Sequence, residues 1–398
     1  MRPLVKKQYI LPFVLITSLF FLWGAAHSIL DVLNKHFQLV IPGMNHAHSS
    51  MVQVMFYLGY FVMAIPAGII IDRRGYRTGV IVGLLLYGFG ALLFWPGAQI
   101  MSFEFFLMSL FIIACGLVFL ETAANPYVTE LGDVETAASR LNLAQSLNGL
   151  GCICGPLFGG LLLFSDGGNE RIALPYVVMG IVVLAVALLF TRVKLPEIAH
   201  QDEHETKGTA EKHRISSLFR NKGFLFGLFA LFSYEVSEIS INSFFINYVA
   251  DGGWMNARDA SIALSFGGLS LFMLGRVLGS FIMQHVDSKR VLRVCAIGTF
   301  ITTLAVVLNM GVLSLGALVL IYVFESIMFP TIFALSLKDL GPLTKRASSL
   351  LMMTPIGGAV GPLMMGLVAD ASTMSVAFIV PLIGFANVAA YAFSDKKV

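Results

Sequence analysis

Seven ionisable side chains of this sequence lie inside long apolar segments, where a charge is costly. They are His27, Asp31, Glu121, Glu235, Glu238, Arg276 and Glu325. The acids outnumber the single arginine, so they cannot all be neutralised in ion pairs, and desolvation favours their protonated forms. Ionisable groups in such surroundings are candidates for binding protons, ions or substrates.

Two of the acids, Asp31 and Glu121, differ in how deeply the sequence places them. Asp31 lies one helical turn after His27, but the polar residues 34–36 follow it, so an alternative puts Asp31 at the edge of its apolar segment. Glu121 follows a long apolar run, FLMSLFIIACGLVFL, and Pro126 shortly after it removes a helix hydrogen bond. The alternative for Glu121 is a structural pair with a neighbouring helix.

Polar side chains also form two stripes at helical spacing. The first stripe is Asn142, Gln145 and Asn148, and the second is Glu235, Glu238 and Asn242. Amides offer both a donor and an acceptor to a hydroxyl group, so these stripes, with Asn125 and His27, are candidates for binding a polyhydroxylated ligand. The alternative is that the amides hold helices together.

The composition defines the elements that must position these side chains. Of the 398 residues, 57% are hydrophobic and 12% are charged, whereas soluble domains carry about 25% charged residues. This excludes a soluble enzyme, a nucleic-acid-binding protein and a disordered chain. A membrane-spanning helix needs about 20 apolar residues, and twelve such runs lie near 9–34, 49–71, 79–98, 102–128, 141–164, 173–193, 223–249, 260–284, 291–310, 312–335, 347–369 and 374–393.

The basic residues predict the orientation of these twelve helices. With both termini in the cytoplasm, 22 of the 26 Lys and Arg residues lie on the cytoplasmic side, as the positive-inside rule requires. Only Lys35, Arg171 and Arg258 lie outside, and Arg276 lies within a span. The sequence therefore predicts a multi-pass protein of the inner membrane with both termini cytoplasmic.

A charged segment near the middle of the chain divides it into predicted domains. Residues 1–193 form an N-terminal six-helix bundle, 194–222 a cytoplasmic linker, and 223–398 a C-terminal six-helix bundle. The linker contains three histidines that could be taken for a metal site, but a solvated polar linker explains them. No phosphate-binding loop, catalytic triad or metal-ligand spacing is present. We therefore expect no catalytic residues, no metal and no cofactor other than a coupling ion.

The two halves repeat a spacing. Gly151 and Gly155-Pro156 follow Arg140 at the same intervals as Gly357 and Gly361-Pro362 follow Arg346. Asn125-Pro126 and Phe329-Pro330 precede Leu131-Gly132 and Leu340-Gly341. Internal six-plus-six repeats are typical of secondary transporters, whose halves rock around a site near the middle of the bilayer.

These motifs resemble a known family. GIIIDRRGYR (68–77) resembles the loop signature of the major facilitator superfamily. LETAANPYVTELG (120–132), RLNLAQSLNGLG (140–151) and MFPTIFALSLKDLG (328–341) are similar to the fucose–proton symporter family. SYEVSEISINSFFINY (233–248), and Glu238 within it, is more similar to the glucose/galactose branch of that family.

The resemblance implies roles for individual residues. The proton-linked carboxylates would be Asp31 and Glu121. Sugar would be bound by Gln145 and Asn148 from the first half and by Glu238 and Asn242 from the second. The cytoplasmic gate would contain Asp72, Arg73 and Arg77. Two acids, Glu235 and Glu325, depart from the family pattern and leave the sugar and the coupling stoichiometry open.

The sequence thus predicts an all-α major facilitator transporter that acts as a monomer and moves a neutral hexose of the glucose/galactose type with protons. Alternatives are a symporter for fucose or N-acetylglucosamine, Na⁺ coupling, a proton-coupled drug antiporter, and a membrane enzyme or sensor. The predicted partners are a small-molecule sugar and the lipid bilayer, with no nucleic acid.

Overall fold

The chain is almost entirely helical and divides into two compact units in a computed structural model. The described residues are 5, 7–131, 137–165, 170–192, 215–283, 285–338, 340, 343, 347 and 350–394. Unit 1 comprises the described residues of Met1–His36 and Met55–Gln201, and unit 2 those of Phe37–Val54 and Asp202–Val398. The boundaries predicted for the two bundles and the linker stay a prediction, and much of the predicted linker lies outside the described residues.

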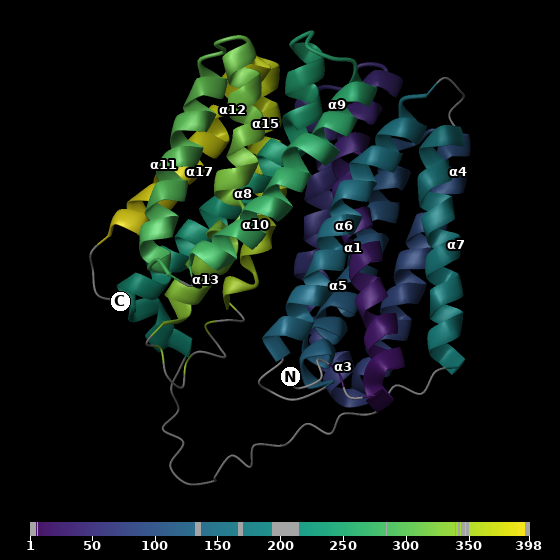
Figure 1. The fold of residues 1–398 in the computed structure, drawn as a ribbon. Coiled ribbons are helices and arrows are strands. Elements are labelled where there is room, and N and C mark those ends of the chain that lie inside the picture. Colours follow the sequence, from purple (N-terminus) through teal and green to yellow (C-terminus); the bar gives the residue numbers. More distant parts are fainter. Residues whose placement is uncertain are drawn as a thin grey trace. The chain divides into compact units, whose positions relative to one another are not determined.

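Long helices build unit 1. They are α1 (Ile10–Val40), α3 (Met51–Leu92), α4 (Phe94–Ile100), α5 (Phe103–Glu130), α6 (Ala137–Leu163) and α7 (Glu170–Arg192), and the ends of α1 and α3 nearest α2 belong to unit 2. Figure 1 shows them in purple to teal. The α3 range holds two helices that meet at Gly75, whose φ of 81° is readily adopted by glycine. The predicted break between the second and third spans is therefore present.

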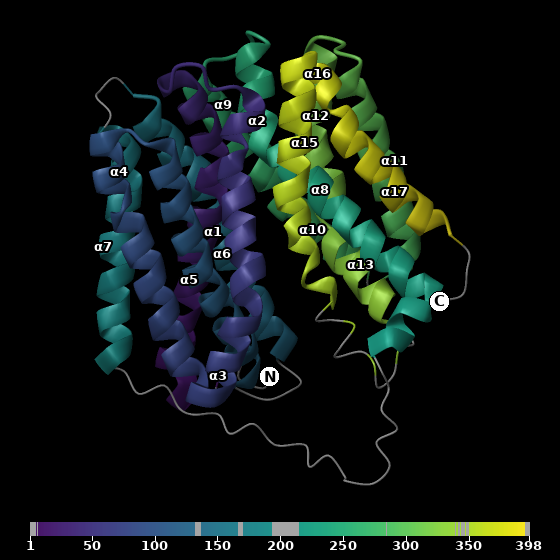
Figure 2. The same ribbon diagram turned by 180° about the vertical axis from the view of Figure 1, so that it is seen from behind.

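Unit 2 is arranged around α8. Its helices are α2 (His46–Ser49), α8 (Lys222–Asp251), α9 (Ala257–Ala263), a π-helix (Leu264–Leu269), α10 (Ser270–Ile282), α11 (Ser288–Val307), α12 (Val312–Glu325), α13 (Met328–Leu337), α15 (Gly357–Ala371), α16 (Met374–Ala377) and α17 (Ile379–Phe393). Helices α13, α15 and α17 pack against α8, and α2 packs against α15, as Figure 2 shows from behind.

Eleven helices of the described part of the chain are long and apolar enough to cross a membrane. The twelfth predicted span, at 347–369, differs: α15 begins at Gly357, after a short 3₁₀ helix, Thr354–Ile356, that contains Pro355. Proline lacks the amide hydrogen that an α-helix interior requires. The predicted all-α fold with two sets of spanning helices is confirmed.

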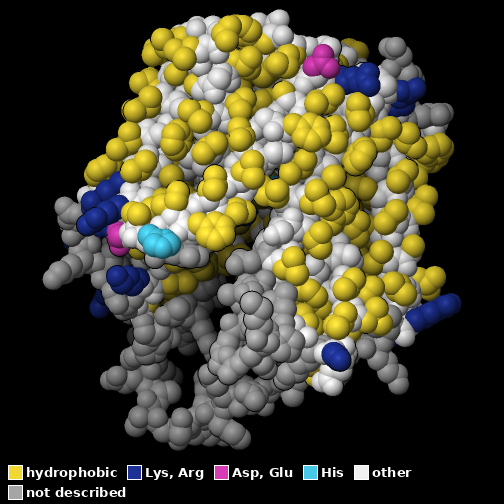
Figure 3. All heavy atoms as spheres, viewed as in Figure 1, with side chains coloured by type: hydrophobic (Ala, Val, Ile, Leu, Met, Phe, Trp, Pro, Cys, Tyr) yellow, Lys and Arg dark blue, Asp and Glu magenta, His cyan; other side chains and the backbone are white. Residues whose placement is uncertain are grey.

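The surface of both units is apolar. Large side chains are strongly exposed, for example Ile65 at 68% and Val312 at 73%. Figure 3 shows hydrophobic side chains over most of the described surface in that view, with few Lys and Arg side chains, mostly near its margins. A soluble monomer rarely exposes apolar patches of this extent, whereas lipid requires them.

The repeated glycines bring one pair of helices together in each unit. In unit 1, Gly151 and Gly155 of α6 lie directly against the backbone of α1, where a Cβ would collide with it. In unit 2, Gly357 and Gly361 of α15 lie against α8 in the same way. Small residues four apart let membrane helices approach closely. The sequence repeat therefore corresponds to a repeated helix–helix interface.

Candidate functional site

His27 lies in an aromatic pocket of unit 1. Its Nε2 atom is 2.7 Å from the hydroxyl of Tyr57, and its ring meets the rings of Phe56 and Tyr57 edge-on, at centroid distances of 5.5 and 5.6 Å. The side chain is half-buried. Either group can donate in this hydrogen bond, so it does not require a charged imidazole.

Asp31 lies one turn beyond His27 on α1 and is buried, with 6% of its surface exposed. Lys35 lies one further turn along and is 5% exposed. Both side chains interact with other groups. Asp31 and the polar residues that follow it are therefore covered by other parts of the protein, and the place of Asp31 along its apolar segment stays a prediction.

Glu121 and Asn125 lie one turn apart on α5, and both side chains are half-buried. The Oδ1 atom of Asn125 is buried and has no hydrogen-bond partner among the described residues. α5 continues through Pro126 to Glu130. This part of α5 therefore presents an accessible carboxyl and an amide oxygen that lacks a donor.

The stripe on α6 presents Gln145 and Asn148, both half-buried. Asn148 donates from Nδ2 to the backbone oxygen of Phe20 at 3.3 Å, and its Oδ1 accepts from the thiol of Cys152 at 3.9 Å. Asn148 thus holds α6 to α1, which is the alternative role foreseen for these amides. The side chain of Asn142 lies outside the described residues.

The predicted gate residues lie at the junction in α3. Arg73 is exposed, and the side chain of Asp72 lies outside the described residues. Arg77 donates from Nε to the backbone oxygen of Phe190 at 3.3 Å, and from a terminal nitrogen to that of Thr191 at 2.6 Å. Arg77 therefore satisfies carbonyls at the C-terminal end of α7, where cations are favoured.

The stripe on α8 contributes three polar side chains to unit 2. Glu235 is 7% exposed, whereas Glu238 and Asn242 are half-buried. The Oδ1 atom of Asn242 is buried and, like that of Asn125, has no hydrogen-bond partner in the described part of the chain. Both amides were candidates from the sequence, and in the structure the Oδ1 atom of each is a buried acceptor without a donor among the described residues.

A helix break lies beside these residues. α12 ends at Glu325, and α13 begins at Met328. Pro330 cannot donate to the backbone oxygen of Ser326, and that oxygen instead accepts from Nε of Arg276 at 3.2 Å. The hydroxyl of Tyr234 donates to the backbone oxygen of Glu325 at 3.2 Å. Side chains of α8 and α10 thus satisfy carbonyls that the break exposes.

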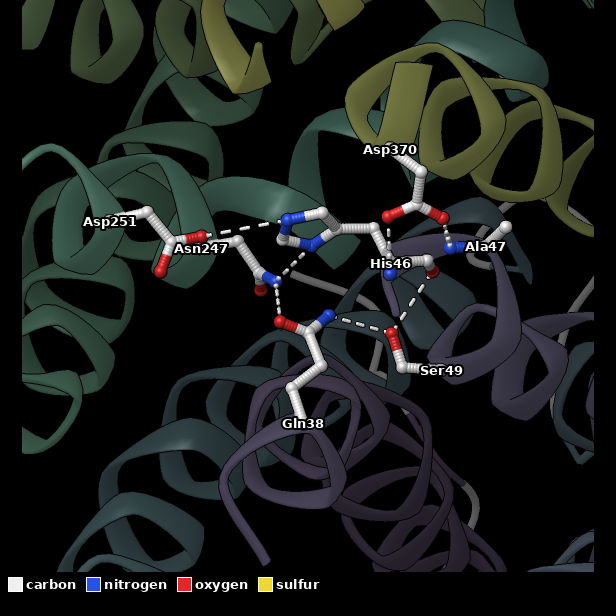
Figure 4. A network of polar contacts seen from close by, with 7 residues as sticks. All are labelled: Gln38, His46, Ala47, Ser49, Asn247, Asp251 and Asp370. Atoms are coloured by element: carbon white, nitrogen blue, oxygen red, sulfur yellow. Dashed lines mark hydrogen bonds and ion pairs between the residues drawn. The ribbon is translucent and has the colours of Figure 1, made fainter. Parts of the chain in front are cut away.

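A polar network within unit 2 was not predicted from the sequence (Figure 4). The carboxylate of Asp370, near the end of α15, accepts from the backbone amides of His46 and Ala47, at 2.8 Å each. The side chain of Asn45 caps the same short helix by accepting from the amide of His48 at 2.7 Å. A carboxylate at free helix amides is a favourable arrangement. Asp370 therefore fixes α2 to α15.

The same network continues to α8. Asn247 donates to Oε1 of Gln38 at 2.7 Å and lies 3.3 Å from Nδ1 of His46. Nε2 of His46 lies 3.9 Å from Asp251. The signal that could have revealed this network is the clustering of polar residues where apolar runs end, but its partners are 201 and 209 residues apart in the chain.

The structure brings the predicted residues together on neighbouring helices within each unit. In unit 1, α6 packs against α1 and α5, which carry the other candidates for binding sugar and protons. In unit 2, α8 faces the break that follows α12. Among the described residues no group of three or more His, Cys, Asp or Glu side chains could hold a metal ion. The arrangement presents amides and carboxyls suited to hydroxyl groups and protons.

Comparison with known proteins shows the family. The family model described as "Major Facilitator Superfamily" matches residues 9–354. The chain belongs to the major facilitator superfamily. The predicted resemblance is thereby confirmed, and the helices of both units are the spanning helices of a multi-pass membrane protein of a transporter family.

Within the major facilitator superfamily, full-length relatives refine the comparison. A glucose/galactose transporter of Brucella abortus is 34% identical over 403 residues, covering 98% of this chain and 96% of the relative. An L-fucose-proton symporter of Escherichia coli is 35% identical over 411 residues, covering 97% and 93%. The crystal structure of the E. coli fucose:proton symporter superposes with a TM-score of 0.69 at 35% identity, covering 96% of this chain and 98% of that one.

Proposed function

We propose that this chain is a secondary transporter that moves a neutral hexose of the glucose/galactose type together with protons. Relatives covering nearly the whole chain at 34% and 35% identity are named as a glucose/galactose transporter and an L-fucose-proton symporter. Because two relatives of similar identity carry different sugars, L-fucose is the second candidate substrate. The proton gradient supplies the energy.

The observation that carries this proposal is the pair of unfilled amide acceptors. Buried polar atoms are nearly always hydrogen-bonded, so Asn125 and Asn242 each hold an acceptor that a ligand hydroxyl can fill. Gln145 on α6, and Glu238 one turn from Asn242 on α8, are half-buried and add further hydrogen-bonding groups. A neutral sugar, rich in hydroxyl donors, matches amides better than an apolar drug does.

Asp31 and Glu121 are the proposed proton carriers. Both lie in apolar helices, where the ionised form of a carboxyl is disfavoured and proton binding can follow the ligand state. In symport the sugar and the proton favour each other's binding, a reciprocal coupling of about 1–3 kcal/mol. Asp72, Arg73 and Arg77 would then stabilise one state of the cycle at the cytoplasmic end.

We further propose that the protein acts as a monomer in the bacterial inner membrane, with both termini in the cytoplasm. A single cysteine at Thr209, with Cys115, Cys152, Cys154 and Cys295 changed to serine, tests the orientation. A membrane-impermeant maleimide should label it in inverted vesicles and not in intact cells. Labelling in intact cells contradicts the proposed orientation.

Transport by the purified protein in proteoliposomes tests the function. We expect glucose or galactose to accumulate when the outside is made acidic, and a protonophore to abolish the accumulation. Fucose and N-acetylglucosamine are included to identify the sugar, and an imposed sodium gradient at equal pH to identify the ion. Accumulation driven by sodium alone contradicts proton coupling, and uptake of none of the sugars contradicts the proposed function.

A further inference from the structure

Glu325 of unit 2 stands in the same sequence context as Glu121 of unit 1. Each is the fifth residue before a proline, in ETAANP and in ESIMFP, and both prolines belong to the repeated segments of the two halves. The local structures differ. Glu121 lies within the continuous helix α5, whereas Glu325 is the last residue of α12, at the break before α13.

The carboxyl of Glu325 is fully buried in the protein. Its side chain has 0% exposure, and neither carboxyl oxygen has a hydrogen-bond partner in the described part of the chain. The nearby hydroxyl of Tyr234 donates its hydrogen bond to the backbone oxygen of Glu325. A buried carboxylate without a donor or a counter-ion is so unfavourable that the group takes up a proton instead.

The titratable and charged groups around Glu325 and Tyr234 lie on α8 and α10. Glu235 and Glu238 lie on α8 with Tyr234, and Arg276 lies on α10. Arg276 attracts Glu238, while its Nε donates to the backbone oxygen of Ser326 and its guanidinium lies 4.7 Å from the ring centre of Phe272. One arginine can neutralise one carboxylate, and it acts on Glu238, which leaves Glu325 to be neutralised by a proton.

Glu238 is half-buried, and its charge acts on that of Glu325. The proposed route of the proton runs from water to Glu238 and on to Glu325. In the second step the O–H bond on Glu238 breaks as one on Glu325 forms, Glu238 regains its negative charge beside Arg276, and release to water reverses the steps.

We propose that Glu325, served by Glu238, binds a second transported proton in unit 2, in addition to the proton carried by unit 1. The claim that this proton is transported rests on the proposed function, whereas the claim that Glu325 binds a proton does not. It assigns a role to an acid that departs from the family pattern. It also predicts two protons for each sugar.

Infrared difference spectroscopy and transport together test the site. Spectra of the purified protein between acidic and alkaline pH should show a protonated-carboxyl C=O band that is absent in Glu325→Gln and retained in the control Glu104→Gln, whose side chain is exposed at the start of α5. In proteoliposomes, the proton-to-sugar ratio should fall from two to one in Glu325→Gln and stay at two in Glu104→Gln.

Each outcome bears on the site. A wild-type ratio of one, an unchanged ratio in Glu325→Gln, or an unchanged infrared band in Glu325→Gln overturns the proposal. If Glu325→Gln does not fold, Glu238→Gln replaces it: the band of Glu325 should then shift, because the neighbouring charge is gone, and a band in its original place overturns the proposal. If wild-type protein moves no sugar with protons, the proposed function fails, but the infrared result still decides whether Glu325 binds a proton.

Discussion

The α1–α6 interface of unit 1 and the α8–α15 interface of unit 2 are built alike but carry different chemistry. Gly151 packs on the backbone at Phe21, and Gly357 packs on the backbone at Phe232. Counting from these contacts, His27 of α1 corresponds to Glu238 of α8. By the same count, Asp31 corresponds to Asn242 and Gly24 to Glu235.

At these two interfaces the glycine packing is therefore repeated, whereas the ionisable side chains on α1 and α8 are not. Unit 1 places an acid at Asp31 and an imidazole at His27, whereas unit 2 exchanges these for an amide and an acid. α5 passes unbroken through Pro126, whereas α12 and α13 are separated before Pro330. We therefore expect equivalent substitutions in the two units to give equal effects on stability and unequal effects on coupling.

Substitution of the coupling acid of unit 1 should have the largest effect, which is a loss of proton-driven sugar accumulation. Glu121→Gln fixes the neutral form of a half-buried carboxyl, so proton movement can no longer be linked to sugar movement. We expect proton-driven accumulation to fall to the equilibrium ratio of one, while counterflow exchange of sugar continues. Asp31→Asn should also lose accumulation.

Uptake and counterflow measured in parallel between pH 5.5 and 8 check this prediction. If Glu121→Gln still concentrates sugar under an imposed pH gradient, Glu121 is not the coupling acid. A loss of counterflow as well would show that the substitution blocks the conformational cycle, so the counterflow assay separates coupling from movement.

The glycine interfaces should give equal losses of stability in the two units. A Cβ at Gly155 would lie 2.9 Å from the backbone oxygen of Ala25, and one at Gly361 would lie 2.6 Å from Oγ of Ser240. Overpacking of this kind costs about 1–3 kcal/mol. We expect Gly155→Ala and Gly361→Ala to lower the free energy of unfolding by similar amounts, measured by thermal or denaturant unfolding in detergent.

The matched controls are Gly68→Ala and Gly316→Ala, which have no heavy atom within 4 Å of the new methyl group. Because alanine is favoured over glycine in a helix by about 1 kcal/mol, these two should be neutral or stabilising. A destabilised control, or a large loss in one interface and none in the other, would break the structural equivalence of the two units.

Substitution of the amide acceptors should have a moderate effect on sugar binding. Asn125→Ala and Asn242→Ala each remove an acceptor that lacks a partner in the protein, so each should weaken sugar binding without loss of stability. Loss of a neutral hydrogen bond costs about 0.5–1.5 kcal/mol, or roughly two- to tenfold in Kd. Asn148→Ala should weaken binding and also lower stability, because its amide holds the backbone of Phe20.

Equilibrium binding of the transported sugar, with thermal unfolding of the same samples, measures both quantities. Gln99→Ala, an exposed amide after α4's first turn, serves as the control and should change neither. Unchanged affinity in both Asn125→Ala and Asn242→Ala would show that these amides do not touch the sugar.

Hydropathy and spacing were enough to predict much of this molecule from the sequence. The apolar runs predicted the spanning helices because a helix satisfies its own backbone hydrogen bonds in lipid. The spacing of Gly151 and Gly155 predicted equivalent segments in the two halves, and the structure adds that these glycines bring helices together. The sequence predicted one span at 312–335, and the structure has one helical span at Val312–Leu337. What the sequence did not show is that Tyr234 and Arg276, far away in the chain, bind the carbonyls of Glu325 and Ser326.

The network at His46 was missed for the same reason. Its bonds join segments separated by more than 200 residues, and no local pattern fixes which polar ends will meet. For the candidate site, helical spacing could place residues on one face, but it could not distinguish the half-buried Glu238 from the fully buried Glu325. That distinction depends on packing between helices.

Substitution of the basic residues at the start of the third and ninth spans should have the smallest effect on stability, and the effect should be equal in the two units. Arg77 holds the last carbonyls of α7, and in unit 2 Arg293 donates from Nε to the backbone oxygen of Ala392, near the end of α17, at 3.0 Å. A cation at a helix C-terminus contributes about 0.3–1 kcal/mol at partly exposed positions, and salt screens the contribution. We expect Arg77→Gln and Arg293→Gln to lower stability by similar small amounts, and less so at high salt.

Thermal unfolding at low and high salt measures this effect, with the exposed Arg74→Gln and Arg290→Gln as controls that should leave stability unchanged. Transport by the same variants separates two roles, because the family resemblance assigns Arg77 to a gate and assigns no such role to Arg293. If Arg77→Gln slows sugar exchange and Arg293→Gln does not, at equal stability, the gate role of Arg77 adds to its helix-end role. If both leave exchange unchanged, both arginines act only by holding helix ends, and the similarity of the two units extends to their basic loops.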